Sequence, residues 1–266
     1  PPSGIRKFFD IVSEMKDAIS LGVGEPDFDT PWHIREEGIY SLEKGRTFYT
    51  SNAGLKDLKI EICNYLKRRF DVEYDYNKEV MVTVGGSEAI DIALRAMLNP
   101  GDEVLIPQPS YVSYTPCTIL ADGVPVTIQL EEKDKFRLTK EKLLEKITPK
   151  TKVLVLPFPN NPTGSIMEAE DLAEIAKVCV EKDLFVISDE IYSELTYKGQ
   201  HCTIAAFPGM KERTVLINGF SKSFAMTGWR LGYACAPEII LKQMLKIHQY
   251  AIMCAPTTSQ YAAVSA

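Results

Sequence analysis

Short apolar runs alternate along the chain with segments in which apolar residues recur every three or four positions. The apolar runs are rich in β-branched residues, which is typical of buried parallel strands. We expect strands over residues 79–84, 103–106, 124–130, 152–156, 184–188, 214–217 and 231–236. Strands and helices in turn predict an α/β fold with a mostly parallel, doubly wound sheet sandwiched by helices.

Helical periodicity follows several of these runs. A polar connector at residues 45–54 leads into a predicted helix whose apolar residues share one face: Leu58, Ile62, Tyr65 and Leu66. Another helix is expected to start at Ser87, and residues 258–266 are typical of a helix without a stop signal. The alternation is absent from residues 28–45, which makes that stretch the candidate domain boundary.

The first expected strand is followed by Gly85, Gly86 and Ser87. We expect Ser87 to be the N-cap of the helix that follows. Free N–H groups and the positive end of the helix dipole would then point at one spot, which is an arrangement that binds anions. An ordinary turn with a serine cap, with no bound anion, is the alternative interpretation.

Composition narrows the classes of partner. There are 36 Asp and Glu against 30 Lys and Arg, a formal charge of −6, so we expect no nucleic-acid partner. No apolar run is long enough to cross a bilayer, so we expect no membrane partner either. The six cysteines include no CxxC pair, which favours reduced thiols in a cytoplasmic protein. The three histidines show no metal-ligand spacing, and we expect no metal site.

Residues that could bind a ligand follow almost every predicted strand. They are Gly86 with Ser87, Tyr111, Asn161, Asp189 with Tyr192, and Lys222 with Arg230. Open α/β sheets bind ligands at the carboxyl edge of their strands, so we expect these residues to converge there. Taken singly, each has a plainer interpretation. A lysine after a strand is usually a solvated cation, and an aspartate at a strand end is often a cap or half of a salt bridge.

Four motifs carry a family resemblance. They are LGVGEPDFDTP at 21–31, PNNPTG at 159–164, SDEIY at 188–192 and SKSFAMTGWRLGY at 221–233. The sequence resembles the class I/II aminotransferases of fold type I, in particular the branch similar to aspartate aminotransferase, over essentially the whole chain. The resemblance implies pyridoxal 5'-phosphate as cofactor. It also implies transfer of an amino group from an L-amino acid to a 2-oxo acid by a ping-pong mechanism.

The resemblance also implies roles for the residues that meet the cofactor ring. Lys222 would form the Schiff base with the cofactor aldehyde and then move the substrate proton. Asp189 would face the pyridine nitrogen and keep it protonated. Asn161 and Tyr192 would donate to the ring oxygen. Tyr111 would lie flat over the ring, with an ordinary core tyrosine as the alternative.

The phosphate site is implied in the same way. Arg230 would bind the phosphate bidentately, together with Gly86, Ser87 and the hydroxyl of Ser221. Some relatives have serine three residues before the lysine, whereas this chain has Gly219, which leaves one phosphate contact in doubt.

The implied assembly is a homodimer. Tyr49 would reach the phosphate of the neighbouring subunit, and Gly24 would lie against the substrate carboxylate together with Asn161. Residues 1–31 would belong with a small domain, and residues 32–266 would form the large domain that binds the cofactor. The rest of the small domain, with the arginine that grips the substrate carboxylate, is expected beyond residue 266. We expect residues 1–31 to pack loosely for that reason, and the 266-residue chain to be inactive alone.

Relatives use cis prolines in the loops that aim Tyr111 and Asn161, so we expect cis peptide bonds before Pro109 and Pro162.

Two other functions fit the same scaffold. One is a carbon–sulfur lyase with the same cofactor, since a fold does not fix the reaction. The other is a non-catalytic ligand-sensing domain, as in regulators that join an aminotransferase-like module to a helix-turn-helix; no such pattern is present near the N-terminus. The sequence leaves the amino donor open among aspartate, alanine, aromatic and branched-chain amino acids.

Overall fold

The computed structural model describes residues 11–12, 14–15, 17, 19, 22 and 24–266. Much of the N-terminal segment expected over residues 1–31 lies outside this set, so the expectation that it packs loosely is not tested.

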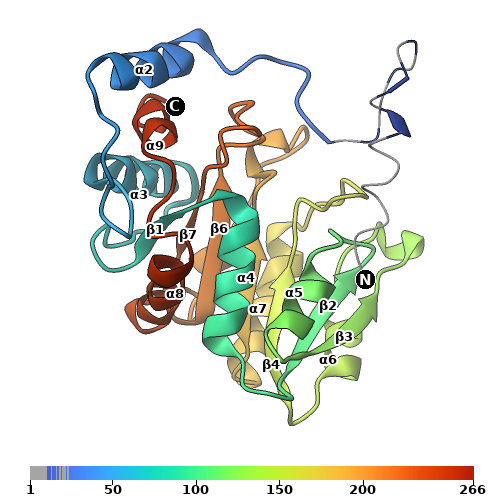
Figure 1. The fold of residues 1–266 in the computed structure, drawn as a ribbon. Helices are drawn as coiled ribbons and strands as arrows, with labels where there is room; N and C mark the ends of the chain where they lie inside the picture. The colour runs from blue at the N-terminus through green and yellow to red at the C-terminus, as the bar shows by residue number, and fades with distance from the viewer. Residues whose placement is uncertain (1–10, 13, 16, 18, 20–21, 23) are drawn as a thin grey trace.

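A mixed seven-stranded sheet forms the centre of the molecule (Figure 1). Its strands are β1 (Val80–Thr83), β2 (Glu103–Gln108), β3 (Val124–Gln129), β4 (Thr151–Leu156), β5 (Phe185–Asp189), β6 (Thr214–Gly219) and β7 (Gly232–Cys235). The spatial order is β1-β7-β6-β5-β4-β2-β3. Only β7 runs antiparallel to its neighbours, β1 and β6. All seven expected strands and the mostly parallel sheet are therefore confirmed.

Helices cover both faces of the sheet, as expected for strands that are apolar on both sides. One face packs against α4 (Gly85–Met97), α5 (Tyr114–Leu120) and α8 (Glu238–Ala251). The other face packs against α3 (Lys56–Phe70), α6 (Lys140–Lys146) and α7 (Ala169–Glu181). In β6, Val215 and Ile217 enter the first core while Leu216 enters the second, and all three are fully buried.

Two further helices lie beside α3 at the β1 side of the sheet. They are α2 (Trp32–Glu43) and α9 (Thr257–Ala263), which pack against each other. The candidate boundary at residues 28–45 is thus mostly the helix α2 and the turn after it. Short 3₁₀ turns complete the chain: η1 (Glu132–Asp134), η2 (Ser193–Leu195), η3 (Ile204–Ala206) and η4 (Lys211–Arg213).

The expectation that Ser87 is the N-cap of α4 is wrong. The helix begins at Gly85, after Val84, and has no side-chain cap bond at its start. Glu88 reaches back instead, and its Oε2 accepts the Val84 N–H at 2.5 Å. Because Glu88 holds the entry to the helix, Ser87 lies within the first turn, and the first N–H groups of α4 have no side-chain cap.

Three X-Pro peptide bonds are cis, those before Pro109, Pro159 and Pro162. The first and third confirm the expectation; the one before Pro159 was not expected. All six cysteines are unpaired. Within the described part of the chain, no helix has both the length and the apolar character needed to span a bilayer.

Candidate active site

The residues singled out from the sequence gather at one edge of the sheet because of its topology. The carboxyl ends of β1, β2, β4, β5 and β6 meet there, since these strands run in the same direction. Arg230 reaches the edge differently from what the sequence predicted. It precedes β7, and because β7 is antiparallel to β6, the amino end of β7 lies at the same edge.

Lys222 lies three residues beyond the end of β6 and is half-buried. Its Nζ donates a hydrogen bond to the carbonyl of Gly24 and lies 5.7 Å from the centre of the Tyr192 ring. Burial lowers the pKa of Lys222, and the nearby Arg230 lowers it further, while Glu25 opposes both. A lowered pKa leaves more of the amine neutral, which is the form that acts as a nucleophile or a base.

Asp189 is the last residue of β5, and only 7% of its surface is exposed. Tyr114 Oη donates to its Oδ2 at 2.7 Å, and the N–H of Ile191 donates to its Oδ1 at 3.3 Å. Burial raises the pKa of Asp189, and these two hydrogen bonds oppose the rise. The carboxylate is therefore poised to gain from a cationic partner, which would favour its charged form.

Tyr114 is a residue that the sequence did not reveal. It is the first residue of α5, is 2% exposed and has a pKa raised well above the ordinary value, chiefly by burial. It therefore acts as a neutral hydrogen-bond donor to Asp189. The only signal in the sequence is its position three residues after Tyr111, which does not show that it faces a strand 75 residues away.

Tyr111 lies next to this pair. Its ring meets that of Tyr114 edge to face, with centroids 5.7 Å apart. Tyr192 and Asn161 also approach each other, because Asn161 Nδ2 lies 3.4 Å from Tyr192 Oη. Burial and the charge of Asp189 raise the pKa of Tyr192. The Tyr192 hydroxyl is thus kept protonated and able to donate.

The start of α4 and Arg230 form a cradle. A Cβ atom built on Gly85 would lie 2.6 Å from Arg230 Nη2, so any larger residue would push the guanidinium out of this position. Gly85 also has a φ of +72°, which glycine adopts without strain. Arg230 Nη1 donates to the carbonyl of Thr227 at 3.0 Å. Gly86 and Ser87 follow in the first turn of α4, whose N–H groups favour an anion.

Two buried polar atoms near this edge have no hydrogen-bond partner within the described chain. They are Ser110 Oγ, next to Tyr111, and Asn160 Nδ2, next to Asn161. Leaving such a group unpaired costs about 1–3 kcal/mol. The edge thus combines an anion cradle, a buried carboxylate, an amine and unpaired polar atoms, a set that fits a phosphorylated pyridine aldehyde.

Two residues complete the predicted set. Ser221 directly precedes Lys222 and is 8% exposed. Tyr49 lies on the segment between α2 and α3, and its side chain is 78% exposed. Among the contacts of the described residues, none joins Tyr49 to the residues at the strand ends.

Comparison with known proteins gives the family. The family model for aminotransferases of class I and II matches residues 16–266. The chain is 54% identical over 263 residues to the putative aminotransferase YugH of Bacillus subtilis, covering 99% of this chain and 68% of that protein. It is 50% identical over 266 residues to the aspartate aminotransferase of Pyrococcus abyssi, covering all of this chain and 68% of that protein.

Solved structures agree. The crystal structure of Pyrococcus protein-A1 superposes with a TM-score of 0.96 at 49% identity, over 99% of this chain and 68% of that one. The aspartate aminotransferase of Thermus thermophilus with maleate superposes with a TM-score of 0.95 at 36% identity, over all of this chain and 70% of that one. These matches give no support to the lyase or ligand-sensing alternatives. The chain belongs to the class I and II aminotransferases, enzymes that use pyridoxal 5'-phosphate to move an amino group from an amino acid to a 2-oxo acid.

Proposed function

We propose that this sheet edge is the site of transamination, and that Lys222 both holds the cofactor and carries the proton. One observation carries the proposal: the Lys222 amine, the Tyr192 ring and the Asp189 carboxylate come together beside the cradle formed by Gly85 and Arg230. When bound, pyridoxal 5'-phosphate supplies an electron sink for the charge left when the substrate Cα–H bond breaks.

Lys222 has the properties that both of its roles require. Its lowered pKa, caused chiefly by burial, provides the neutral Nζ that attaches to the cofactor aldehyde. Lys222 Nζ would also be the base that takes the proton from the substrate Cα. The Gly24 carbonyl holds Nζ near the Tyr192 ring before the cofactor binds.

Asp189 controls the charge of the ring nitrogen. Its carboxylate is held by Tyr114 and by the N–H of Ile191. This carboxylate would hold the protonated pyridine nitrogen of the cofactor, because opposite charges stabilise each other in a buried site. Asn161 and Tyr192 would supply hydrogen-bond donors to the ring oxygen, and Tyr111 would supply an aromatic face for the ring.

The phosphate is bound at the start of α4. Gly86 and Ser87 supply N–H groups at the positive end of the helix dipole, and Ser221 supplies a hydroxyl. Arg230, fixed against Gly85, offers two parallel N–H donors. Gly24 and Asn161 border the place where the substrate carboxylate lies.

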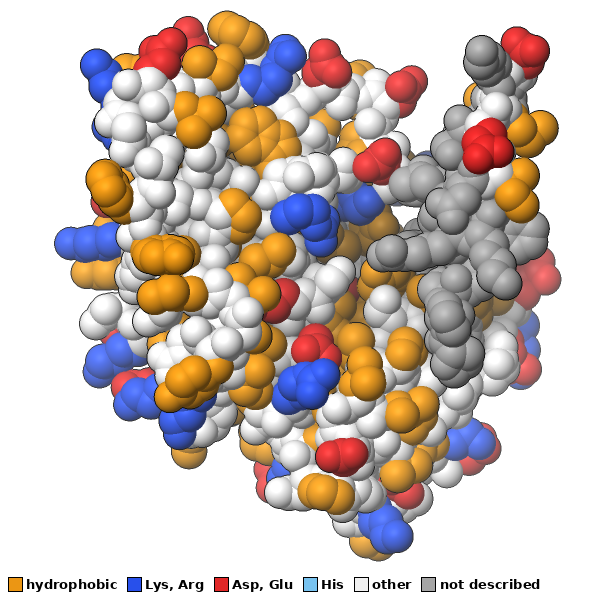
Figure 2. Space-filling view, viewed as in Figure 1, with side chains coloured by type: hydrophobic (Ala, Val, Ile, Leu, Met, Phe, Trp, Pro, Cys, Tyr) orange, Lys and Arg blue, Asp and Glu red, His pale blue; other side chains and the backbone are white. Residues whose placement is uncertain are grey.

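The active unit is a homodimer in which Tyr49 reaches the neighbouring site. Large apolar side chains are exposed on α2, on the loop after it and near the end of α8: Ile39, Leu42, Phe48, Tyr49, Tyr250 and Met253. Figure 2 shows apolar side chains on the side of the molecule where these helices lie. Such surface supports burial against a second copy.

The proposal also covers the division into domains and the location in the cell. Residues 32–266 are the large domain, and residues 1–31 associate with a small domain. The six unpaired cysteines support a cytoplasmic location.

A single-turnover screen tests the reaction. The cofactor-loaded protein is mixed with one amino acid at a time, including aspartate and aromatic amino acids, which the names of relatives from Pyrococcus abyssi and Thermococcus litoralis suggest. Transamination predicts one 2-oxo acid per site, with steady turnover only after an amino acceptor is added. Pyruvate and ammonia released without an acceptor would mean elimination instead. Lys222→Arg serves as the control: it keeps the charge, cannot attach to the aldehyde and should not turn over.

A further inference from the structure

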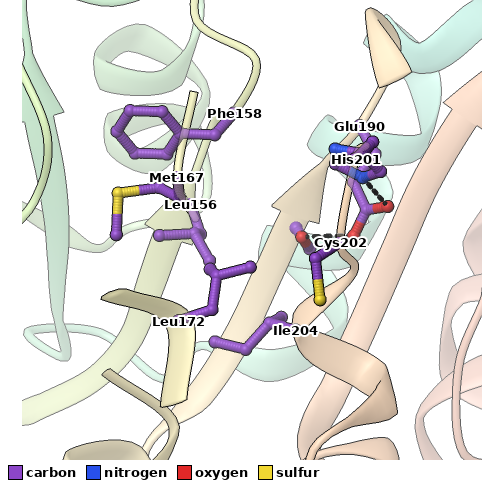
Figure 3. Close-up of a pocket in the computed structure, with 9 residues that line it drawn as sticks. Leu156, Phe158, Met167, Leu172, Glu190, His201, Cys202 and Ile204 are labelled. Carbon is purple, nitrogen blue, oxygen red and sulfur yellow. Dashed lines mark hydrogen bonds and ion pairs between the residues drawn. The ribbon is translucent and has the colours of Figure 1, made fainter. Parts of the chain in front are cut away.

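Glu190 is a buried carboxylate for which the mechanism above has no use. It follows Asp189 directly and is 1% exposed. Three side chains form hydrogen bonds with it. The hydroxyls of Ser188 and Thr203 donate to its Oε1 at 2.8 and 2.6 Å. His201 Nε2 bonds its Oε2 at 2.7 Å (Figure 3). Both oxygens of this buried carboxylate are thus paired, which holds the side chain in one orientation.

The backbone of Glu190 is tied down as well. Its N–H donates to the carbonyl of Ile217 on β6 at 2.8 Å, and its carbonyl accepts the N–H of Ser193 at 2.9 Å. The next residue, Ile191, supplies the N–H that bonds Asp189 Oδ1. The direction of the Asp189 carboxylate therefore depends on how Glu190 is held.

The cavity beside this cluster is too small to be a ligand site. It measures about 10 Å³, room for one water molecule at most. Figure 3 shows its two sides: apolar side chains, among them Leu156 and Phe158, lie opposite Glu190 and His201. The apolar wall makes the surroundings of Glu190 less polar, which strengthens its hydrogen bonds.

The charge of Glu190 also acts on its neighbour. Burial is the main cause of the raised pKa of Asp189, and the charge of Glu190 adds to it. The contacts that hold Glu190 therefore fix where its charge lies relative to Asp189.

We propose that Glu190, held by His201, Ser188 and Thr203, is a positioning residue that keeps the Asp189 carboxylate aligned for the cofactor ring. The proposal rests on the role proposed above for Asp189. It assigns no chemical step to Glu190, which acts only through its neighbour.

Three variants test it. Glu190→Ala removes all three bonds. Glu190→Gln keeps the shape and an oxygen that accepts from the two hydroxyls, but places an NH2 group opposite His201 Nε2. His201→Ala is a milder loop change. The apoprotein is titrated with pyridoxal 5'-phosphate to give the Kd, and kcat and KM are then measured on the loaded enzyme. We expect Glu190→Ala to raise the Kd and lower kcat by about tenfold each with little change in KM, since hydrogen bonds to a charged group are lost. Glu190→Gln should recover most of both, and His201→Ala should fall between.

A matched control separates positioning from stability. Leu143→Ala removes a fully buried side chain from α6 and should lower the melting temperature while leaving the Kd and kcat unchanged. The inference is overturned if Glu190→Ala lowers the melting temperature but binds cofactor and turns over like Leu143→Ala.

The double variant Asp189→Ala with Glu190→Ala gives the sharpest outcome. If Glu190 acts through Asp189, the second change should add little to the first. An equal loss from Glu190→Ala in both backgrounds would contradict the inference. If Asp189→Ala alone leaves the half-reaction intact, the proposed role of Asp189 fails instead, so the two failures are distinguishable.

Discussion

Removal of the Tyr114 hydroxyl gives the most quantitative test of how Asp189 is held. Tyr114→Phe deletes one oxygen and leaves the ring in place between Tyr111 and α4. The lost hydrogen bond is 2.7 Å long, joins groups that are 2% and 7% exposed, and has a charged acceptor. Such bonds contribute about 1.5–3 kcal/mol. We expect the apoprotein to lose about that much free energy of unfolding at neutral pH, roughly a 10- to 150-fold change in the equilibrium constant.

The pH dependence of this loss has a definite sign. In the folded protein, burial has already raised the pKa of Asp189, and the Tyr114 bond opposes the rise. Tyr114→Phe raises that pKa further. Below the folded pKa, Asp189 is protonated in both proteins and the loss is small. The loss should grow as the pH rises through the folded pKa of the native protein and level off above that of the variant.

The assay is denaturant unfolding of the apoprotein at a series of pH values, with Tyr65→Phe as the matched control. Tyr65 also donates to a carboxylate, Glu194 Oε1 at 2.6 Å, but on the more exposed side of α3. Its variant should lose less stability and bind pyridoxal 5'-phosphate normally. Equal stability of Tyr114→Phe and the native protein across the pH range, or a loss that does not change with pH, would refute the reasoning.

Three further outcomes follow from the site. Asp189→Ala should still bind the cofactor but slow the half-reaction by about a hundredfold or more, which corresponds to about 1.4 kcal/mol of barrier for each tenfold. Near-normal rates in rapid-mixing experiments would contradict the role of Asp189 at the ring nitrogen. Gly85→Ala should destabilise the apoprotein by about 1–3 kcal/mol in denaturant and raise the cofactor Kd, because of its positive φ and the contact with Arg230; unchanged values would argue against the cradle. In the apoprotein, acylation of Lys222 followed by mass spectrometry should begin at lower pH than that of the exposed lysines, because burial lowers its pKa; simultaneous labelling would argue otherwise.

The sequence predicted the sheet well because its strands are continuous apolar runs that need helices on both sides. Lys222 and Asp189 could be placed at the sheet edge because each follows such a run. Arg230 was expected at the carboxyl end of a strand, but it lies at the amino end of β7, which is antiparallel to β6. The sequence of a single strand does not show whether it runs parallel or antiparallel to its neighbours. The prediction that Ser87 is the N-cap was wrong. The helix begins two residues earlier, and the Glu88 side chain accepts the N–H of Val84 there.

The contacts that orient the site were beyond sequence reasoning. Tyr114 meets Asp189 from 75 positions away, and His201 meets Glu190 across a loop without regular periodicity. Apolar patterning shows which face of an element is buried. It does not show which two polar groups meet within that buried layer.

Attachment of the cofactor to Lys222 is the central claim, and reductive trapping tests it most directly. The protein is incubated with pyridoxal 5'-phosphate, reduced with borohydride, digested and mapped by mass spectrometry, with Lys222→Ala treated in parallel. We predict a visible absorbance band that borohydride removes, one stable adduct per chain on Lys222, and no stoichiometric adduct in Lys222→Ala. A stoichiometric adduct on another lysine, or equal labelling of the native protein and Lys222→Ala, would contradict the account.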